Sequence, residues 1–179
     1  MSERDALEAL FRKHGYHNFT WIKPESIVVS QWVRLKCLFG CPTYGKNASC
    51  PPNTPSVSEC RSFFSEYSQA VLFHFTKTVE RPEDRHSWSR EINRNLLALE
   101  REVFLAGYEK VLLLFMDSCS LCADCAAVRA QCKVPRSARP APEAMAVDVF
   151  ATVRQYGLPI DVLSDFSQPM NRYAFLMIE

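Results

Sequence analysis

The sequence lacks the patterns that mark several large protein classes. Its longest apolar run, from Val111 to Met116, is far too short to span a membrane and predicts a buried strand. It contains no H-E-x-x-H pair, P-loop, G-x-G-x-x-G motif or nucleophile elbow. The formal net charge is only +1, so no basic field indicates binding to nucleic acid. We therefore expect neither a nucleic-acid partner nor membrane association. No sequence motif indicates a particular reaction.

An export signal is also lacking, because the residues from Met1 to Asp5 are polar and no apolar segment follows them. This predicts a soluble protein of the reducing cytoplasm. The 179 residues, 47% of them apolar, suit one domain over residues 1–179 that needs no crosslinks. The chain nevertheless has eight cysteines. In a cytoplasmic protein, clustered cysteines indicate metal or redox chemistry rather than disulfides.

Hydrophobic periodicity and helix-end signals predict alternating helices and strands. The expected helices are at 2–14, 57–67, 87–106 and 142–157, and the expected strands at 27–29, 33–35, 70–75, 110–116, 160–163 and 173–178. Two cysteine-rich loops, at about 36–60 and 117–140, interrupt this pattern. The order favours crossover connections. The predicted fold is therefore α/β, with a mixed, largely parallel sheet packed by helices.

The second cysteine set gives the sharper signal, with the spacing C-x2-C-x2-C-x6-C over Cys119, Cys122, Cys125 and Cys132. Two residues between cysteines allow one tight loop to aim several sulfurs at one centre. Bacterial ferredoxins use C-x2-C-x2-C for a 4Fe-4S cluster, although their fourth spacing is x3. Zinc is the main alternative, commonly held by two separated C-x2-C pairs. A structural or disulfide role is the third.

The first set comprises Cys37, Cys41, Cys50 and Cys60, with the spacing C-x3-C-x8-C-x9-C. This spacing matches no common zinc finger, but cysteine at every position indicates a soft metal. Cys60 is the weak member, since a cysteine on a helix is often simply a small buried residue. If Cys60 is not a ligand, three thiolates leave an open position for a substrate or a ligand from a partner.

Other polar residues near these loops carry weaker signals. Basic residues that would favour a negatively charged cluster, or simply form solvated surface, are Arg34, Lys36, Lys46, Arg129, Lys133, Arg136 and Arg139. For Asp117, Asp124 and Asp148 we expect a surface or capping role, with proton transfer as the alternative. His74, within an apolar strand, is expected to be a hydrogen-bonded core histidine rather than a ligand.

The two motifs together resemble an uncharacterised prokaryotic family of predicted metal-binding proteins, domain of unknown function 2284. The residues that carry the resemblance span about 34–160: Cys37, Cys41-Pro-Thr-Tyr-Gly-Lys46, Cys50-Pro-Pro52, Cys119, Cys122, Cys125, Cys132, Pro135, Arg139-Pro140, Glu143-Ala144 and Val147-Asp148. The resemblance implies metal binding by cysteines in a bacterial or archaeal cytoplasm. It implies no reaction.

The sequence thus favours a protein with one or two iron–sulfur clusters of the 4Fe-4S type that transfers electrons with a redox partner protein or assists a redox enzyme. One alternative is a structural zinc module that presents an interaction surface. The other is an enzyme or metal-delivery protein with an open three-cysteine iron site. Whether the protein is an enzyme, and in which oligomeric state it acts, the sequence leaves open.

Overall fold

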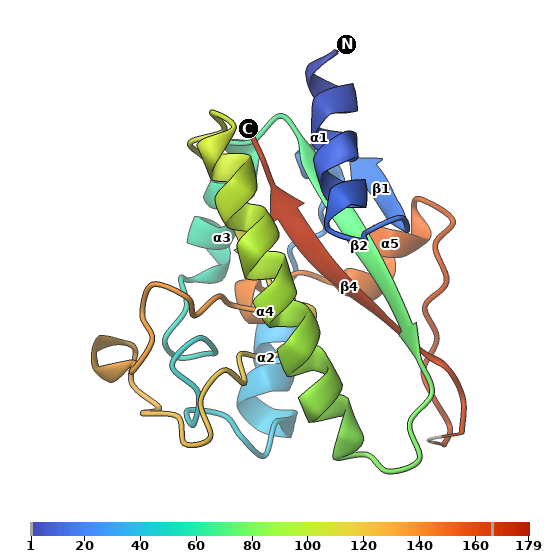
Figure 1. Cartoon of the computed structure of the whole chain (residues 1–179). Helices are drawn as coiled ribbons and strands as arrows, with labels where there is room; N and C mark the ends of the chain where they lie inside the picture. Colours follow the sequence, from blue (N-terminus) through green and yellow to red (C-terminus); the bar gives the residue numbers. More distant parts are fainter. Residues whose placement is uncertain (1, 166) are drawn as a thin grey trace.

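The structure is a computed structural model that describes residues 2–165 and 167–179 (Figure 1). Its helices are α1 (Glu3–Lys13), α2 (Gln31–Gly40), α3 (Val57–Ser65), α4 (Asp84–Leu105) and α5 (Val149–Arg154). Its strands are β1 (Phe19–Ile22), β2 (Ala70–Lys77), β3 (Leu112–Leu114) and β4 (Met170–Met177). Single 3-10 turns lie at Pro24–Ser26, Arg129–Gln131 and Glu143–Met145.

The four strands form one sheet in the order β1-β2-β4-β3, and every neighbouring pair is antiparallel. The prediction of a largely parallel sheet is therefore wrong. β2 and β3 do run in the same direction, as expected for a strand–helix–strand unit, because each is antiparallel to β4. The last strand, β4, inserts between them and pairs with both. Periodicity finds strands along the chain but does not reveal which strands become neighbours.

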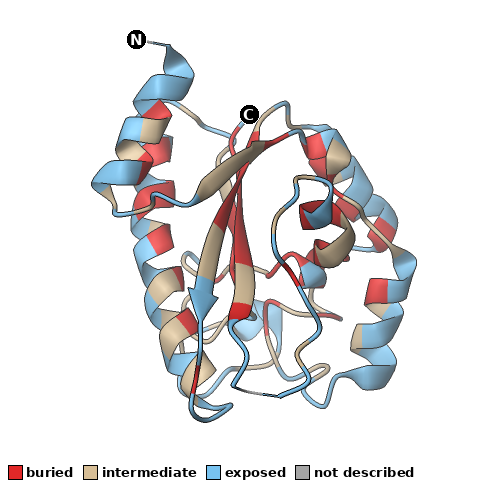
Figure 2. Ribbon diagram, turned by 90° about the vertical axis from the view of Figure 1, so that its right-hand side faces the viewer, coloured by how far each residue is buried: buried red, intermediate tan, exposed pale blue. Residues whose placement is uncertain are grey.

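Helices cover both faces of the sheet, because its central strands are apolar on both sides. In β2, Leu72 faces one apolar cluster, which includes residues of α3 and α5, while Val71 and Phe73 face another, which includes residues of α1 and α4. Figure 2 shows the buried stripes of the helices turned toward the central strands. This core holds the sheet rigid behind the cysteine loops.

The predicted helices at 2–14, 57–67 and 87–106 and the strands at 70–75, 110–116 and 173–178 are confirmed within a few residues. Ser2 and Asp5 form the expected capping box of α1. The predicted strand at 33–35 is wrong, since those residues belong to α2. The segments 27–29 and 160–163 form no strand, apart from one isolated bridge between Val29 and Val147.

Two further differences concern the chain around the site. Strand β1 has no counterpart among the predicted elements, since its four residues give too short a pattern. The helix predicted over 142–157 is broken, because Ala146 adopts a left-handed conformation, with φ of 60°, between the 3-10 turn at Glu143–Met145 and α5. In the described residues, no helix combines the length and the apolar character that crossing a membrane requires.

Candidate metal centres

The first cysteine set begins on α2, not in a loop as predicted. Cys37 lies in the last turn of this helix and Cys41 follows it directly, with the Cys41 N–H donating to the Cys37 carbonyl at 3.3 Å. Residues four apart lie on the same face of a helix, so both thiols point to one side. A loop then brings in Cys50, and these three cysteines line a cavity of about 200 Å³. The helix and its following loop thus gather three thiols.

Cys60 does not belong to this cavity. It lies on α3, where Val57, Cys60 and Phe64 form the buried face, and the Cys60 side chain is 0% exposed. Its Sγ donates a long hydrogen bond of 3.7 Å to the Pro55 carbonyl. The structure therefore places Cys60 in the apolar core, apart from the other three cysteines of the first set.

The structure brings all four cysteines of the second set together. These cysteines, Cys119, Cys122, Cys125 and Cys132, line a small cavity of about 20 Å³. This volume is little more than one water molecule occupies. No carboxylate or imidazole lines this cavity among the described residues, so the four thiols are its strongest candidate metal ligands. All eight cysteines are free thiols in this structure.

The two loops contact each other directly, as Figure 1 shows for the cysteine-rich segments beside α2. The Asn47 side-chain amide donates to the Cys119 carbonyl at 2.7 Å, and the Ala48 N–H donates to the Cys125 sulfur at 3.3 Å. Asn53 donates to the Ala127 carbonyl at 2.7 Å and accepts from the Arg129 N–H at 3.2 Å. Part of the first loop therefore forms a wall of the second site.

Sequence reasoning missed Asn47 and Asn53. Asparagine in a loop normally indicates only a turn, because its side chain bonds nearby backbone. Here each amide also reaches the other loop, which lies more than 70 residues away in the chain. No pattern within one segment signals a contact of this range.

Burial controls the ionisation of the gathered thiols. It raises the pKa of Cys37 and of Cys119, and it raises the pKa of Cys50 to about 12. The negative charges of neighbouring thiolates act in the same direction, and for Cys50 these neighbours include Cys119 of the second set. Without a cation the buried thiols stay protonated. A bound metal ion reverses this preference, because it stabilises thiolates.

Two carboxylates adjoin the first set. Glu143 and Asp117 both line the 200 Å³ cavity. Glu143 is accessible from the cavity, yet protein surrounds it on the other sides and raises its pKa to about 7. Burial also raises the pKa of Asp117, an effect that nearby Arg172 and Arg85 partly offset. Asp148, in contrast, caps α5 by accepting the Ala151 N–H at 2.9 Å, which is the predicted capping role.

Several basic residues predicted near the clusters are engaged elsewhere. Arg34 donates to the Thr54 hydroxyl and to the Pro55 and Ala144 carbonyls at 2.9 to 3.1 Å, so it anchors the first loop. Arg139 forms a two-pronged ion pair with Glu100, with both contacts at 2.9 Å. Of the remaining candidates, Lys133 lines the second cavity.

His74 is hydrogen-bonded as predicted, but it is half-buried and not a core residue. Its Nδ1 accepts from the Asn18 amide at 2.8 Å, and its Nε2 lies 2.8 Å from the Asn171 side-chain oxygen. The ring also stacks on Tyr173, with 4.8 Å between centroids. Both ring nitrogens are thus occupied, and neither points to the cysteine loops.

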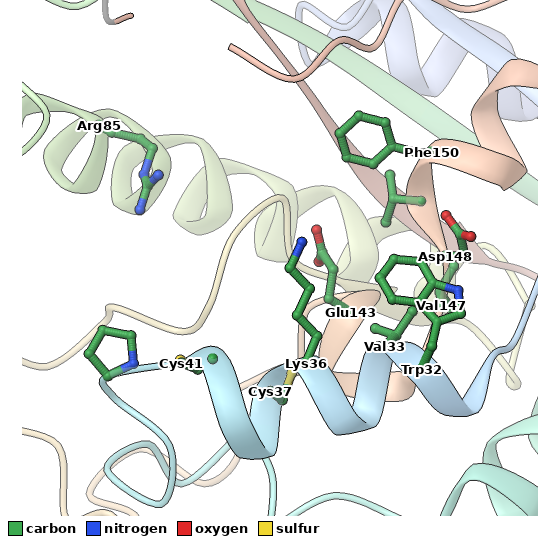
Figure 3. Close-up of a pocket in the computed structure, with 13 residues that line it drawn as sticks. Trp32, Val33, Lys36, Cys37, Cys41, Arg85, Glu143, Val147, Asp148 and Phe150 are labelled. Atoms are coloured by element: carbon green, nitrogen blue, oxygen red, sulfur yellow. The ribbon is translucent and has the colours of Figure 1, made fainter. Parts of the chain in front are cut away.

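A larger cavity of about 550 Å³ adjoins the first set and shares Cys37, Cys41 and Glu143 with it (Figure 3). Its other walls come from α2, α4 and α5. Two thiols of the first set, those of Cys37 and Cys41, therefore line a space of the size that small-molecule sites occupy.

Within residues 2–165 and 167–179, no group of three or more cysteine, histidine, aspartate or glutamate side chains is arranged to hold one metal ion. The donors are nevertheless those of a soft-metal site, because four thiols line the second cavity and three line the first. A tetrahedral zinc ion needs its four sulfurs at about 3.8 Å from each other. A four-iron cluster is larger than one ion and holds its thiolates further apart.

Comparison with known proteins finds one match, to a protein family. No curated protein and no solved structure matches the chain. A family model described as "Predicted metal-binding protein (DUF2284)" matches residues 20–178, which include both cysteine sets. The cysteine-rich chain therefore belongs to this family of predicted metal-binding proteins.

Proposed function

We propose that the protein holds two adjoining metal centres, that the second is an iron–sulfur cluster, and that it serves electron transfer or assists a redox enzyme. One observation carries this proposal: seven cysteines from distant parts of the chain line two neighbouring cavities, while Cys60 stays in the core. Buried cysteines of a purely structural kind would be scattered through the core as Cys60 is.

The second centre has the donors that a 4Fe-4S cluster requires. Its four thiols include the C-x2-C-x2-C trio typical of bacterial ferredoxins. Such a cluster supplies one-electron transfer at a potential that hydrogen bonds to sulfur tune. The Ala48 N–H already donates to the Cys125 sulfur, and a donor at this place favours the reduced, more negative state. Cys125 is exposed, which suits contact with a redox partner protein.

The first centre has three thiols and an open side. Cys37, Cys41 and Cys50 face a cavity that also contains the Glu143 and Asp117 carboxylates. Because the Asn47 segment belongs to the first loop and bonds the second, the two centres share a wall. A short path of this kind suits electron transfer from an outer centre to an inner one that meets a ligand.

Zinc at the second set is the alternative, and the small cavity there favours it. A volume of about 20 Å³ accommodates a single ion with less rearrangement than a four-iron cluster. In that case the metal fixes the two long loops, and the protein presents an interaction surface without redox activity.

Metal analysis of protein purified without air tests the proposal. We expect iron and acid-labile sulfide, a brown colour, and an electron paramagnetic resonance signal after reduction. Cys122→Ser should remove the signal of the second centre, and Cys37→Ser should remove that of the first, if the first also holds iron. Zinc without sulfide in colourless protein would reject the iron–sulfur proposal and establish the alternative.

We further infer that the protein works in the cytoplasm with a redox partner protein. Its free thiols and high cysteine density suit a reducing compartment, where cysteines remain available to metals. Isolation of the protein with its reduced centres intact from the cytoplasmic fraction would support this, and a periplasmic or secreted location would contradict it.

A further inference from the structure

The 550 Å³ cavity has two chemically different halves (Figure 3). On one side lie the aromatic rings of Trp32, from α2, and Phe150, from α5, with three valines between them. On the other side lie Cys37 and Cys41 of the first set. Small-molecule sites commonly combine an apolar wall of this kind with a few polar groups that fix orientation.

Two cations belong to this cavity. The Lys36 side chain rises from α2 between the two halves, and Arg85 reaches toward the cavity from α4 (Figure 3). In the described part of the chain, Lys36 takes part in no ion pair, and its ammonium lies 5.9 Å from the centre of the Trp32 ring. Arg85 has only a long contact of 3.7 Å with Asp117. Lys36 is therefore available to an anion, whereas Arg85 already lies beside a carboxylate.

Two carboxylates, Asp148 and Glu143, also line the cavity, but among the described residues neither forms an ion pair with Lys36. Asp148 is committed to capping α5. Glu143 lies at the boundary with the smaller cavity and lines both. An anion beside Lys36 would therefore form the ion pair that this ammonium lacks within the chain.

We propose that this cavity binds a small organic carboxylate with an aromatic or similarly apolar body. The body packs between Trp32 and Phe150, and the carboxylate lies at Lys36. Bound in this way, the ligand lies beside Cys37 and Cys41, so it would be the molecule that meets the first metal centre. This last step rests on the proposed function, but the binding site itself is formed by the chain alone.

Calorimetric titration of the purified, metal-loaded protein tests the proposal, with naphthalene-1-acetate as the probe and the uncharged naphthalene-1-acetamide as its match. We expect the carboxylate to bind about tenfold more tightly than the amide, since a charge-assisted contact adds to the same apolar burial. Equal affinities, or no binding of the carboxylate, would overturn the proposal.

Matched variants locate the site. Lys36→Gln should abolish most of the preference for the carboxylate, while Lys77→Gln, an exposed lysine away from the cavity, should leave it unchanged. Trp32→Ala should weaken carboxylate and amide by the same factor, about tenfold, and Phe104→Ala should not. Trp32 is 49% exposed and Phe104 is 53% exposed, so neither truncation threatens folding. Binding that Lys36→Gln and Trp32→Ala both leave unchanged would place the ligand elsewhere and refute the proposal.

The failure of this inference and that of the proposed function are distinguishable. Iron and sulfide in a protein that binds neither probe would refute only the carboxylate site. Selective binding of the carboxylate by a protein without iron would uphold the site and refute only the iron–sulfur proposal. A change in the paramagnetic signal on adding naphthalene-1-acetate, absent in Trp32→Ala, would support both.

Discussion

At the scale of single residues, the cysteines of this chain occupy two different environments, the apolar core and the wall of a cavity. Cys60 packs against apolar neighbours such as Phe64 on the inner face of α3, whereas Cys37 and Cys41 face a cavity at the end of α2. The difference arises because α3 is amphipathic, and Cys60 lies on its buried face together with Val57 and Phe64. The apparent fourth member of the first motif is therefore a core residue.

We predict that Cys60→Ala leaves the metal and sulfide content unchanged and lowers the free energy of unfolding by about 1 kcal/mol. The loss comes from a small cavity in the core, not from a lost ligand. Metal analysis with urea unfolding checks both parts. Cys122→Ser is the matched control, which should lose the second centre. Loss of metal in Cys60→Ala would show that Cys60 is a ligand after rearrangement of α3.

At the scale of secondary-structure elements, a buried ion pair fixes the second cysteine loop to the fold. Glu100 of α4 accepts two hydrogen bonds from Arg139, at the end of that loop, and a third from the Leu113 N–H of β3 at 2.8 Å. The Glu100 side chain is only 7% exposed. One carboxylate thus joins the long helix, an edge strand and the chain that leaves the second site.

We predict that Glu100→Gln lowers the free energy of unfolding by about 3 kcal/mol, because it leaves the Arg139 charge without its partner. Guanidinium unfolding measures this loss. Glu102→Gln on the same helix is the control: Glu102 pairs with Lys13, which is 69% exposed, and the expected loss is below about 1 kcal/mol. Equal losses in the two variants would mean that burial of the Glu100 pair contributes nothing.

At the scale of the whole molecule, the protein consists of a packed sheet with helices and of two loops beside one end of it. Apolar residues fill both faces of the sheet, while the loops depend on a few hydrogen bonds, on Arg34, and on whatever their thiols bind. Regions with few buried apolar contacts open more readily than a packed core. Metal should therefore stabilise the loops more than the sheet.

Removal of metal from the anaerobic protein by a strong iron chelator should increase amide hydrogen exchange in 41–56 and 117–138. Amides of the paired strands β2 and β4 should keep their protection, because the apolar core remains. Exchange measured by mass spectrometry before and after chelation checks this. Unfolding of the whole chain on chelation would contradict it, as would loops whose exchange does not change.

Local patterns predicted much of this protein correctly. The capping box of Ser2 and Asp5 and the apolar repeat through Leu96, Leu99 and Val103 are complete within one helix, so α1 and α4 follow from them. The strand prediction at 33–35 failed because short apolar segments suit helix and strand equally. Those residues lie in α2, which turns Cys37 and Cys41 toward the same side.

Local sequence specifies which thiols are close in the chain, and it thereby supplies the sulfur donors of the candidate centres. Tertiary structure decided the rest. It inserted β4 between β2 and β3, removed Cys60 into the core, and brought Asn47 to Cys119 and Glu143 to the first set. The physical reason is range: spacing records only neighbours along the chain, whereas strand order and shared cavities result from how distant apolar faces are buried together.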